Sequence, residues 1–232
     1  MKKTNKKAII LLSGGLDSVV SIACAKEQGI DFSLALTFDY GQKSFEKEKQ
    51  ASEKIADFYG IKHSCINLDW LKQICGSSLV SEAEVPHVDV EKLDDTNVTK
   101  NSMKSVWIPN RNGLFINIAA AYADSFSYDY IVIGANKEEA QTFSDNSKKF
   151  IRDINIALET STNYDVKVIA PLIDSDKNEI VKKAVELKVP LELINSCYNN
   201  TKKHCGECES CNRLKRALKN ARQEKLIEKL FG

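Results

Sequence analysis

The distribution of apolar residues along the chain predicts an alternation of buried strands and amphipathic helices. Residues 8–12 (AIILL) form a continuous apolar run, as expected for a strand that is buried on both faces of a sheet. Residues 45–59 are instead charged and amphipathic, and a glycine follows them where a helix would end. The predicted strands are residues 8–12, 32–38, 62–68, 130–134 and 166–170. The predicted helices are residues 18–28, 45–59, 112–126, 147–159 and 177–187, with one or two more in residues 213–230.

This alternation predicts the fold class. Strands that alternate with helices call for a parallel sheet with helices on both faces. We therefore expect an α/β fold with a doubly wound sheet over residues 1–190 and a small helical region over residues 191–232. Residues 69–106 interrupt the alternation of strands and helices, because their apolar residues show only weak periodicity. Long irregular segments in compact domains are often functional, so we interpret this one as a substrate-side lid, with a tolerated surface insertion as the alternative.

Composition narrows the class of protein. The 232 residues allow a sizeable core, and only four prolines and ten glycines argue against disorder. With 33 basic and 32 acidic side chains, the net charge of +1 gives no reason to expect nucleic acid or a membrane surface as the main partner. The apolar run at residues 8–12 is shorter than the roughly seven residues that a secretory signal needs. We expect a cytoplasmic protein.

A turn rich in glycine and serine joins the first predicted strand to the first predicted helix, with the sequence SGGLDS from Ser13 to Ser18. Its glycines let the backbone approach a ligand closely, and the first amides of the helix favour an anion. The spacing differs from the Walker loop and from the Gly-x-Gly-x-x-Gly signature of dinucleotide-binding proteins. The turn predicts a phosphate-binding loop. The alternative is an ordinary turn in which Asp17 or Ser18 caps the helix.

Four of the seven cysteines lie close together in the sequence: Cys197, Cys205, Cys208 and Cys211. Four thiolates at this spacing suit tetrahedral Zn²⁺, and an iron–sulfur cluster is the competitor. Ferredoxin-type clusters need a further cysteine downstream, and none follows Cys211. We predict one zinc ion per chain in a closed site, which is structural and takes no part in the chemistry.

Residues 13–18 resemble the pyrophosphate-binding loop of the N-type ATP pyrophosphatases, or PP-loop enzymes. The resemblance implies a Rossmann-like sheet of the adenine nucleotide alpha hydrolase type, which binds ATP and directs a substrate oxygen to the α-phosphorus. A loop of this kind stabilises the departing pyrophosphate. The resemblance implies ATP contacts from Leu12, Ser13, Gly14, Gly15, Leu16, Asp17, Ser18 and Lys177. Mg²⁺ is expected with the phosphates, and Asp17 is expected to face it.

Motifs along nearly the whole chain resemble one family of this superfamily, the 7-cyano-7-deazaguanine synthases of queuosine and archaeosine biosynthesis. They are YGQ at residues 40–42, PNRN at residues 109–112, PL at residues 171–172, and SCY at residues 196–198 before CGECESC at residues 205–211. The resemblance implies a ligase that adenylates 7-carboxy-7-deazaguanine, forms an amide with ammonia and adenylates again to give the nitrile. It implies catalytic roles for Asp17, Lys177 and Arg111, and substrate contacts from Tyr40, Gln42, Arg111, Phe143 and Asp145.

One segment departs from the family pattern. After the fourth strand the family carries an aromatic residue followed by Pro-Asp-Cys-Arg, whereas residues 142–147 read TFSDNS. Phe143 offers a stacking face for a purine ring, and the Asp145 carboxylate could accept two hydrogen bonds from its guanidine-like edge. The alternatives are a core contact for Phe143 and a helix cap for Asp145.

Three other functions stay open on the sequence. One is a PP-loop enzyme that modifies tRNA, which would need a basic surface and, for a thiolase, a free cysteine such as Cys65 or Cys75. The others are a family variant that modifies a protein or DNA, and a non-catalytic binding module. The resemblance favours a small-molecule enzyme that is a homodimer and has no nucleic acid or membrane partner.

Overall fold

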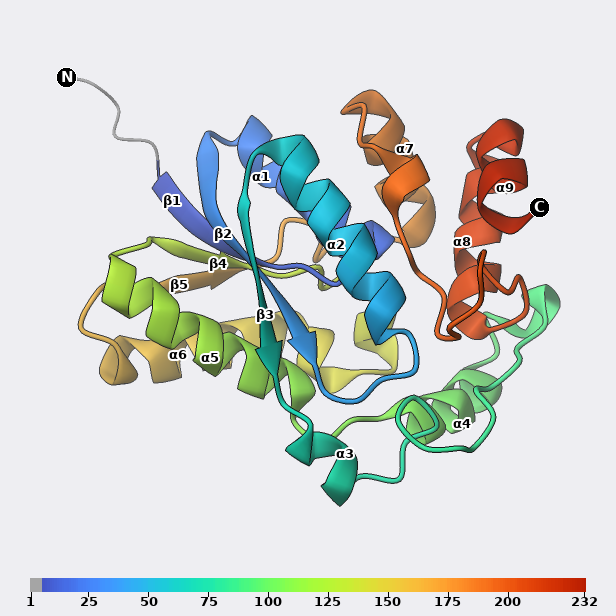
Figure 1. The fold of residues 1–232 in the computed structure, drawn as a ribbon, viewed down its shortest axis with the longest axis horizontal. Helices are drawn as coiled ribbons and strands as arrows, with labels where there is room; N and C mark the ends of the chain where they lie inside the picture. Colours follow the sequence, from blue (N-terminus) through green and yellow to red (C-terminus); the bar gives the residue numbers. More distant parts are fainter. Residues whose placement is uncertain (1–5) are drawn as a thin grey trace.

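The computed structural model describes residues 6–232, except for the side chain of Thr96, and it is built on one parallel sheet (Figure 1). The strands are β1 (Lys6–Leu11), β2 (Ile30–Asp39), β3 (Lys62–Asn67), β4 (Tyr130–Val132) and β5 (Lys167–Ile169). They lie in the order β3-β2-β1-β4-β5, and every neighbouring pair is parallel. The predicted α/β fold class is confirmed.

The order of the strands creates a crevice beside β1. The chain leaves β1 toward β2 and β3 and then returns to β4 on the other side of β1. The connections after β1 and β4 therefore run away from each other, and the space between them opens at the carboxyl ends of the strands. Both the loop at residues 13–18 and the segment after β4 lie at this edge of the sheet.

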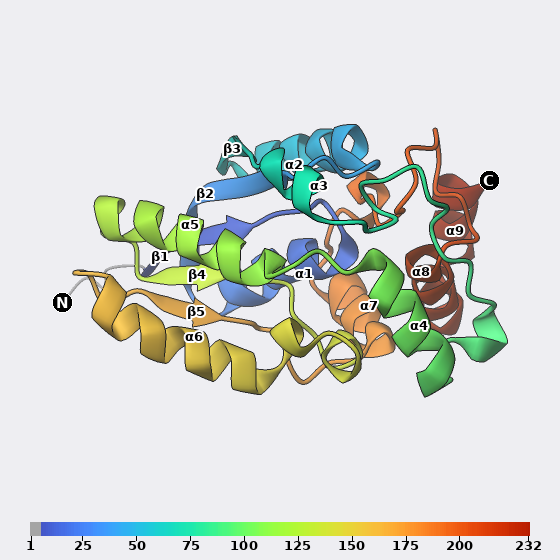
Figure 2. The same ribbon diagram turned by 90° about the horizontal axis from the view of Figure 1, so that it is seen from below.

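Helices cover both faces of the sheet, as Figures 1 and 2 show. They are α1 (Leu16–Glu27), α2 (Phe45–Tyr59), α3 (Trp70–Ile74), α4 (Thr96–Val106), α5 (Arg111–Phe126), α6 (Lys148–Ser161), α7 (Lys177–Glu186), α8 (Glu209–Asn220) and α9 (Glu224–Phe231). Short 3₁₀ turns are η1 (Val90–Lys92), η2 (Glu139–Gln141), η3 (Ser144–Asn146) and η4 (Leu191–Leu193).

Alternate residues of β1 enter opposite cores, because successive strand side chains point to opposite faces. Ala8 and Ile10 pack with α1, α2 and α7, whereas Ile9 packs with α5 and α6. The apolar residues of α8 and α9 join the first of these cores. The predicted boundary at residue 190 therefore does not separate two hydrophobic cores in the described chain.

The segment at residues 69–106, predicted to be irregular, contains the helices α3 and α4. Asp95 caps α4 by accepting hydrogen bonds from the amides of the next turn. The prediction missed this helix because its sequence, TNVTKNSMKSV, is rich in residues that have weak helix propensity. The segment is fastened to α8, where Asn212 Nδ2 donates to Val88 O at 2.9 Å and Arg216 pairs with Asp94 at 2.8 Å. Figure 2 shows α4 lying next to α8.

Candidate active site

A cavity of about 260 Å³ lies at the carboxyl ends of β1, β2 and β4. Doubly wound sheets bind their ligands at this position. The predicted site residues that line it are Leu12, Ser13, Gly15, Leu16, Asp17, Ser18, Tyr40, Arg111, Phe143, Lys177 and Cys197. Gly14, Gln42 and Asp145 are not part of the lining. The fold thus brings together the loop, Arg111 and Lys177, which are far apart in the sequence.

The glycine-rich turn presents the start of α1 to the cavity. The residue at the helix N-cap is Gly15, so the alternative in which Asp17 or Ser18 caps the helix is wrong. Gly14 has a φ of +71°, and a Cβ on it would lie 2.7 Å from the Cβ of Ala51. Only glycine fits there without strain. The positive end of the α1 dipole therefore reaches a backbone turn that an anion can approach.

Gly134, shortly after β4, packs against this helix start. A Cβ on Gly134 would lie 2.7 Å from the Ser18 amide nitrogen and 3.0 Å from the Asp17 carbonyl carbon. Gly134→Ala is therefore expected to lower nucleotide affinity at least about tenfold and to destabilise the fold by about 1–3 kcal/mol. Calorimetric titration with Mg-ATP and thermal denaturation measure the two effects. Gly76→Ala is the matched control, because nothing lies within 4 Å of a Cβ there. Equal Mg-ATP affinity and equal melting temperature in the two variants would contradict the prediction.

Asp17 and Lys177 form a shielded ion pair in the cavity. The Lys177 Nζ lies 2.5 Å from Asp17 Oδ2 and 2.9 Å from Glu139 Oε1, and its side chain is only 11% exposed. Burial raises the pKa of Asp17 to about 6, against the opposing attraction of Lys177. Burial also disfavours the charge of Lys177, but the two carboxylates outweigh this effect and raise its pKa well above the usual value. A fixed positive charge thus lies beside the predicted phosphate loop.

The other oxygen of Asp17, Oδ1, is buried and has no hydrogen-bond partner within residues 6–232. A buried carboxylate oxygen without a partner is costly unless a ligand satisfies it. Magnesium is commonly bound by one or two carboxylates together with substrate phosphates. The oxygen therefore fits a role for Asp17 toward a metal ion that accompanies a nucleotide.

Two acidic residues that the sequence pattern did not indicate, Glu138 and Glu139, complete this charge cluster. Glu138 accepts the Lys177 amide at 2.9 Å, and its other oxygen lies 2.9 Å from Arg213 Nη1. Both residues line the cavity. They follow the carboxyl end of β4, and their position next to the reversal of the strand order is the signal that could have identified them.

Arg111 supplies a second cation to the cavity. Its Nη1 donates to the Tyr40 hydroxyl at 3.3 Å, and its guanidinium lies 5.8 Å from the centroid of the Tyr40 ring. Burial opposes the charge of Arg111, but Tyr40 and Asp145 raise its pKa. Burial also raises the pKa of Tyr40 to about 12, so its hydroxyl stays neutral. A partly buried guanidinium of this kind suits a carboxylate or phosphate ligand.

Phe143 and Asp145, from the segment that departs from the family pattern, take different positions. Phe143 lines the cavity and also stacks on Trp107 with a centroid distance of 6.3 Å. Asp145 interacts electrostatically with Arg111. Ser147, and not Asp145, caps α6, so the alternative of a cap role for Asp145 is wrong. Their contacts with a substrate stay predictions.

Gln42 holds the turn that follows β2. Its amide donates to Phe38 O and to Glu48, and its oxygen accepts the Tyr40 amide. Glu48 itself lines the cavity, and burial raises its pKa. Gln42 therefore positions Tyr40 and Glu48, while its predicted substrate contact is untested. The lining residues outside the prediction include Phe115, Asn195, Ser196, Tyr198, Glu209 and Arg213.

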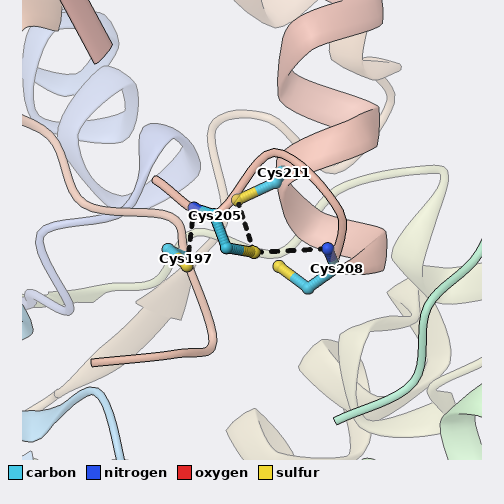
Figure 3. Close-up of side chains that lie close together, drawn as sticks. All are labelled: Cys197, Cys205, Cys208 and Cys211. Atoms are coloured by element: carbon cyan, nitrogen blue, oxygen red, sulfur yellow. Dashed lines mark hydrogen bonds between the residues drawn. The ribbon is translucent and has the colours of Figure 1, made fainter. Parts of the chain in front are cut away.

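The four predicted cysteine ligands converge at the start of α8 (Figure 3). Their sulfur atoms all lie within 4.8 Å of one another, and Cys205 Sγ is 3.8 Å from Cys211 Sγ. Tetrahedral zinc with bonds of about 2.3 Å holds its sulfurs about 3.8 Å apart, so the set fits zinc. An iron–sulfur cluster inserts iron and sulfide atoms between the thiolates and needs wider spacing. Hydrogen bonds from the thiols of Cys208 and Cys211 lower the pKa of Cys197 well below its usual value.

The fold and the loop define an α/β protein of the PP-loop class. A solved structure of the same fold is the U34-tRNA thiolase NcsA from Methanococcus maripaludis, which carries a [4Fe-4S] cluster. It is 16% identical, with a TM-score of 0.51 over 98% of this chain and 71% of that one. Its similarity supports the fold alone.

The family follows from the sequence comparisons. The model of the queuosine biosynthesis protein QueC matches residues 7–222. A 7-cyano-7-deazaguanine synthase from Methanosarcina barkeri is 47% identical over 97% of this chain and 99% of its own length. One from Carboxydothermus hydrogenoformans is 50% identical over 91% of this chain and 98% of its own. The chain therefore belongs to the QueC family, and the predicted family and enzyme class are confirmed.

Proposed function

We propose that this chain is an ATP-dependent 7-cyano-7-deazaguanine synthase, which converts 7-carboxy-7-deazaguanine and ammonia into the nitrile. The observation that carries the proposal is the near full-length similarity to relatives of that name. The cavity has matching chemistry, with a phosphate-type loop, the largely shielded cation Lys177 and the partly buried guanidinium of Arg111. Neither Cys65 nor Cys75 lines it, which disfavours the thiolase alternative.

The proposed reaction has three steps. The substrate carboxylate attacks the α-phosphorus of ATP, and pyrophosphate leaves. Ammonia attacks the acyl carbon, AMP leaves, and a proton is lost to give the amide. The amide oxygen then attacks a second ATP, pyrophosphate leaves again, and loss of AMP and of the protons on nitrogen gives the nitrile. Each adenylation converts a poor leaving oxygen into a phosphate ester that departs readily.

The residues of the cavity have separate tasks in this scheme. The amides at the start of α1 and the Lys177 ammonium stabilise charge on the departing pyrophosphate. Arg111 orients the substrate carboxylate. Mg²⁺, when bound, neutralises charge on the phosphates, and Asp17 would hold it. The Cys197, Cys205, Cys208 and Cys211 sulfurs would hold zinc, which stabilises the fold.

Incubation of the chain with 7-carboxy-7-deazaguanine, ammonium and Mg-ATP tests the proposal. Mass spectrometry should detect the nitrile, with two AMP released for each nitrile formed. Nitrile formation that is absent while the acid and ATP both bind would overturn it. AMP release with a tRNA substrate instead would favour the tRNA-modifying alternative. We also propose a homodimer, which light scattering coupled to size-exclusion chromatography measures.

The first adenylation should depend on pH through Asp17. Its pKa is about 6 in the folded chain, against 3.8 for the unperturbed group. The active carboxylate is present above about pH 6 and falls about tenfold at pH 5. Pyrophosphate release with the acid but without ammonium avoids the titration of ammonia, and at subsaturating Mg-ATP its rate reports the protonation of Asp17 in the ligand-free chain. A flat profile from pH 8 to pH 5 would contradict the assignment.

The same pKa also sets a stability dependence. Between about pH 4 and 6 the folded Asp17 keeps its proton while the unfolded one loses it. In the ligand-free chain, Asp17 should therefore contribute a loss of stability as the pH rises through this window, and a comparison of the melting temperatures of the wild type and Asp17→Asn at pH 4 and pH 7 isolates that contribution.

A further inference from the structure

The segment that precedes the cysteine cluster is hydrogen-bonded directly to the phosphate-type loop. Asn195 donates its amide to Gly14 O at 2.8 Å, and the Leu16 amide donates to Ser196 Oγ at 3.2 Å. These contacts join residues that are about 180 positions apart in the sequence. They place Asn195 and Ser196 against the turn that receives an anion, and both residues line the cavity.

The same segment is tied to the cysteine cluster on its other side. Ser196 donates its amide to His204 Nε2 at 3.0 Å, and the Cys205 amide donates to Cys197 Sγ at 3.4 Å. Cys197 follows Ser196 directly and is itself buried. A displacement of the Cys197 sulfur is therefore transmitted to the loop through one peptide unit.

Two donors on this segment are free to meet a ligand. Asn195 Nδ2 is buried and has no hydrogen-bond partner within residues 6–232. Ser196 Oγ accepts from the Leu16 amide and makes no second hydrogen bond in the same residues, so its own hydroxyl hydrogen is available. An amide and a hydroxyl beside a helix N-terminus are suitable donors for phosphate oxygens.

Apolar packing around the segment is sparse. The local hydrophobic cluster contains only Val85 and the cysteines Cys197, Cys208 and Cys211 as buried members. Without a metal, these contacts offset little of the entropy cost of fixing the chain between residues 195 and 208. A nucleotide that needs Asn195 and Ser196 in place would then have to bear that cost on binding.

We propose that Asn195 and Ser196 donate to a phosphate of the bound nucleotide, and that they couple zinc binding at the cysteine cluster to nucleotide binding. The inference rests on the proposed ATP site. It assigns the cluster a positioning role beyond the closed structural site that the sequence predicts. Because coupling free energies are reciprocal, each ligand should raise the affinity for the other by the same factor.

Calorimetry with Mg²⁺ and α,β-methylene-ATP, which cannot be cleaved at the α-phosphorus, tests the coupling on the full chain. Removal of zinc by a chelator under reducing conditions should weaken nucleotide binding by about 10–100-fold. A chromophoric chelator competing for zinc should show the same factor when the nucleotide is added. Equal nucleotide affinity with and without zinc would overturn the proposal. No binding to the zinc-loaded chain would instead overturn the proposed ATP site.

Variants separate the coupling from a loss of folding. Ser196→Ala and Asn195→Ala, with zinc content and melting temperature unchanged, should each weaken nucleotide binding about fivefold or more, the value of one hydrogen bond. Ser196→Thr keeps the hydroxyl and should restore the affinity. Lys202→Ala, at an exposed position of the same loop, is the matched control. Wild-type affinity in both alanine variants would overturn the proposal even if the zinc-free chain unfolds.

Discussion

Replacement of Asp17 by asparagine is expected to abolish turnover while the chain stays at least as stable as the wild type. The burial that raises the pKa of Asp17 to about 6 shows that the folded environment disfavours its charge. Asparagine has the same shape and removes that charge, and Lys177 keeps its contact with Glu139 at 2.9 Å. The buried ammonium therefore does not lose every partner, which would otherwise cost about 3–5 kcal/mol.

The loss of activity has a separate cause. Oδ1 of Asp17 is buried and has no partner within residues 6–232, and it is the oxygen that we propose to meet a metal at the phosphates. An amide oxygen is a much weaker ligand for Mg²⁺ than a carboxylate, and it carries no charge to balance the metal. We expect adenylation to fall on the order of 10³-fold, a loss typical of removing one preorganised electrostatic group.

The measurement pairs pyrophosphate release with thermal denaturation of Asp17→Asn. Asp57→Asn, at an exposed position of α2, is the control and should leave the rate of pyrophosphate release and the melting temperature unaltered. Activity within tenfold of the wild type would refute the metal role of Asp17. A large drop in melting temperature would show instead that the carboxylate is needed for folding.

Local signals in the sequence were sufficient to predict the loop and the cysteine cluster. The turn at residues 13–18 needs glycine for backbone reasons and follows a buried strand, so its position could be predicted, and a phosphate ligand proposed, from neighbours in the chain. Cys205, Cys208 and Cys211 likewise lie within a single turn and helix start. Features of this kind can be recognised from the sequence because all of their essential residues lie close together in the chain.

Features that depend on long-range packing escaped prediction. Asn195 and Ser196 join the site only because the chain before Cys197 meets the Gly14 carbonyl and the Leu16 amide. Ser196 lies in the SCY motif at residues 196–198, but no local pattern shows that it accepts a hydrogen bond from an amide in another part of the fold. Asp145 is a different case, since the family resemblance implied a substrate contact for it, and the structure places it outside the cavity lining but close enough to act electrostatically on Arg111.

Loss of the cysteine cluster should have the largest effect on stability. Zinc in structural sites contributes about 10–16 kcal/mol of folding free energy in small zinc-binding units, which is comparable to the whole stability of a typical domain. Here the cluster lies at the start of α8, whose Leu214 and Leu218 belong to the same core as β1 and α7. Disorder that begins at the cluster should therefore reach the main sheet and not remain confined to the C-terminal helices.

Cys208→Ser removes one fully buried sulfur ligand. The Cys208 backbone also forms an antiparallel β-bridge with the His87 backbone, which fastens residues 69–106 to the cluster, so loss of the metal should loosen this segment as well. A loss of about 4–5 kcal/mol would lower the melting temperature by about 10–20 °C in a chain of this size. Cys65→Ser, at an exposed cysteine outside the cluster, should leave the melting temperature unchanged.

Thermal denaturation and elemental analysis together test the structural zinc site. The wild type should hold one zinc per chain, and Cys208→Ser should hold much less. Stoichiometric iron in the wild type, or full zinc content and an unchanged melting temperature in Cys208→Ser, would contradict a structural zinc site.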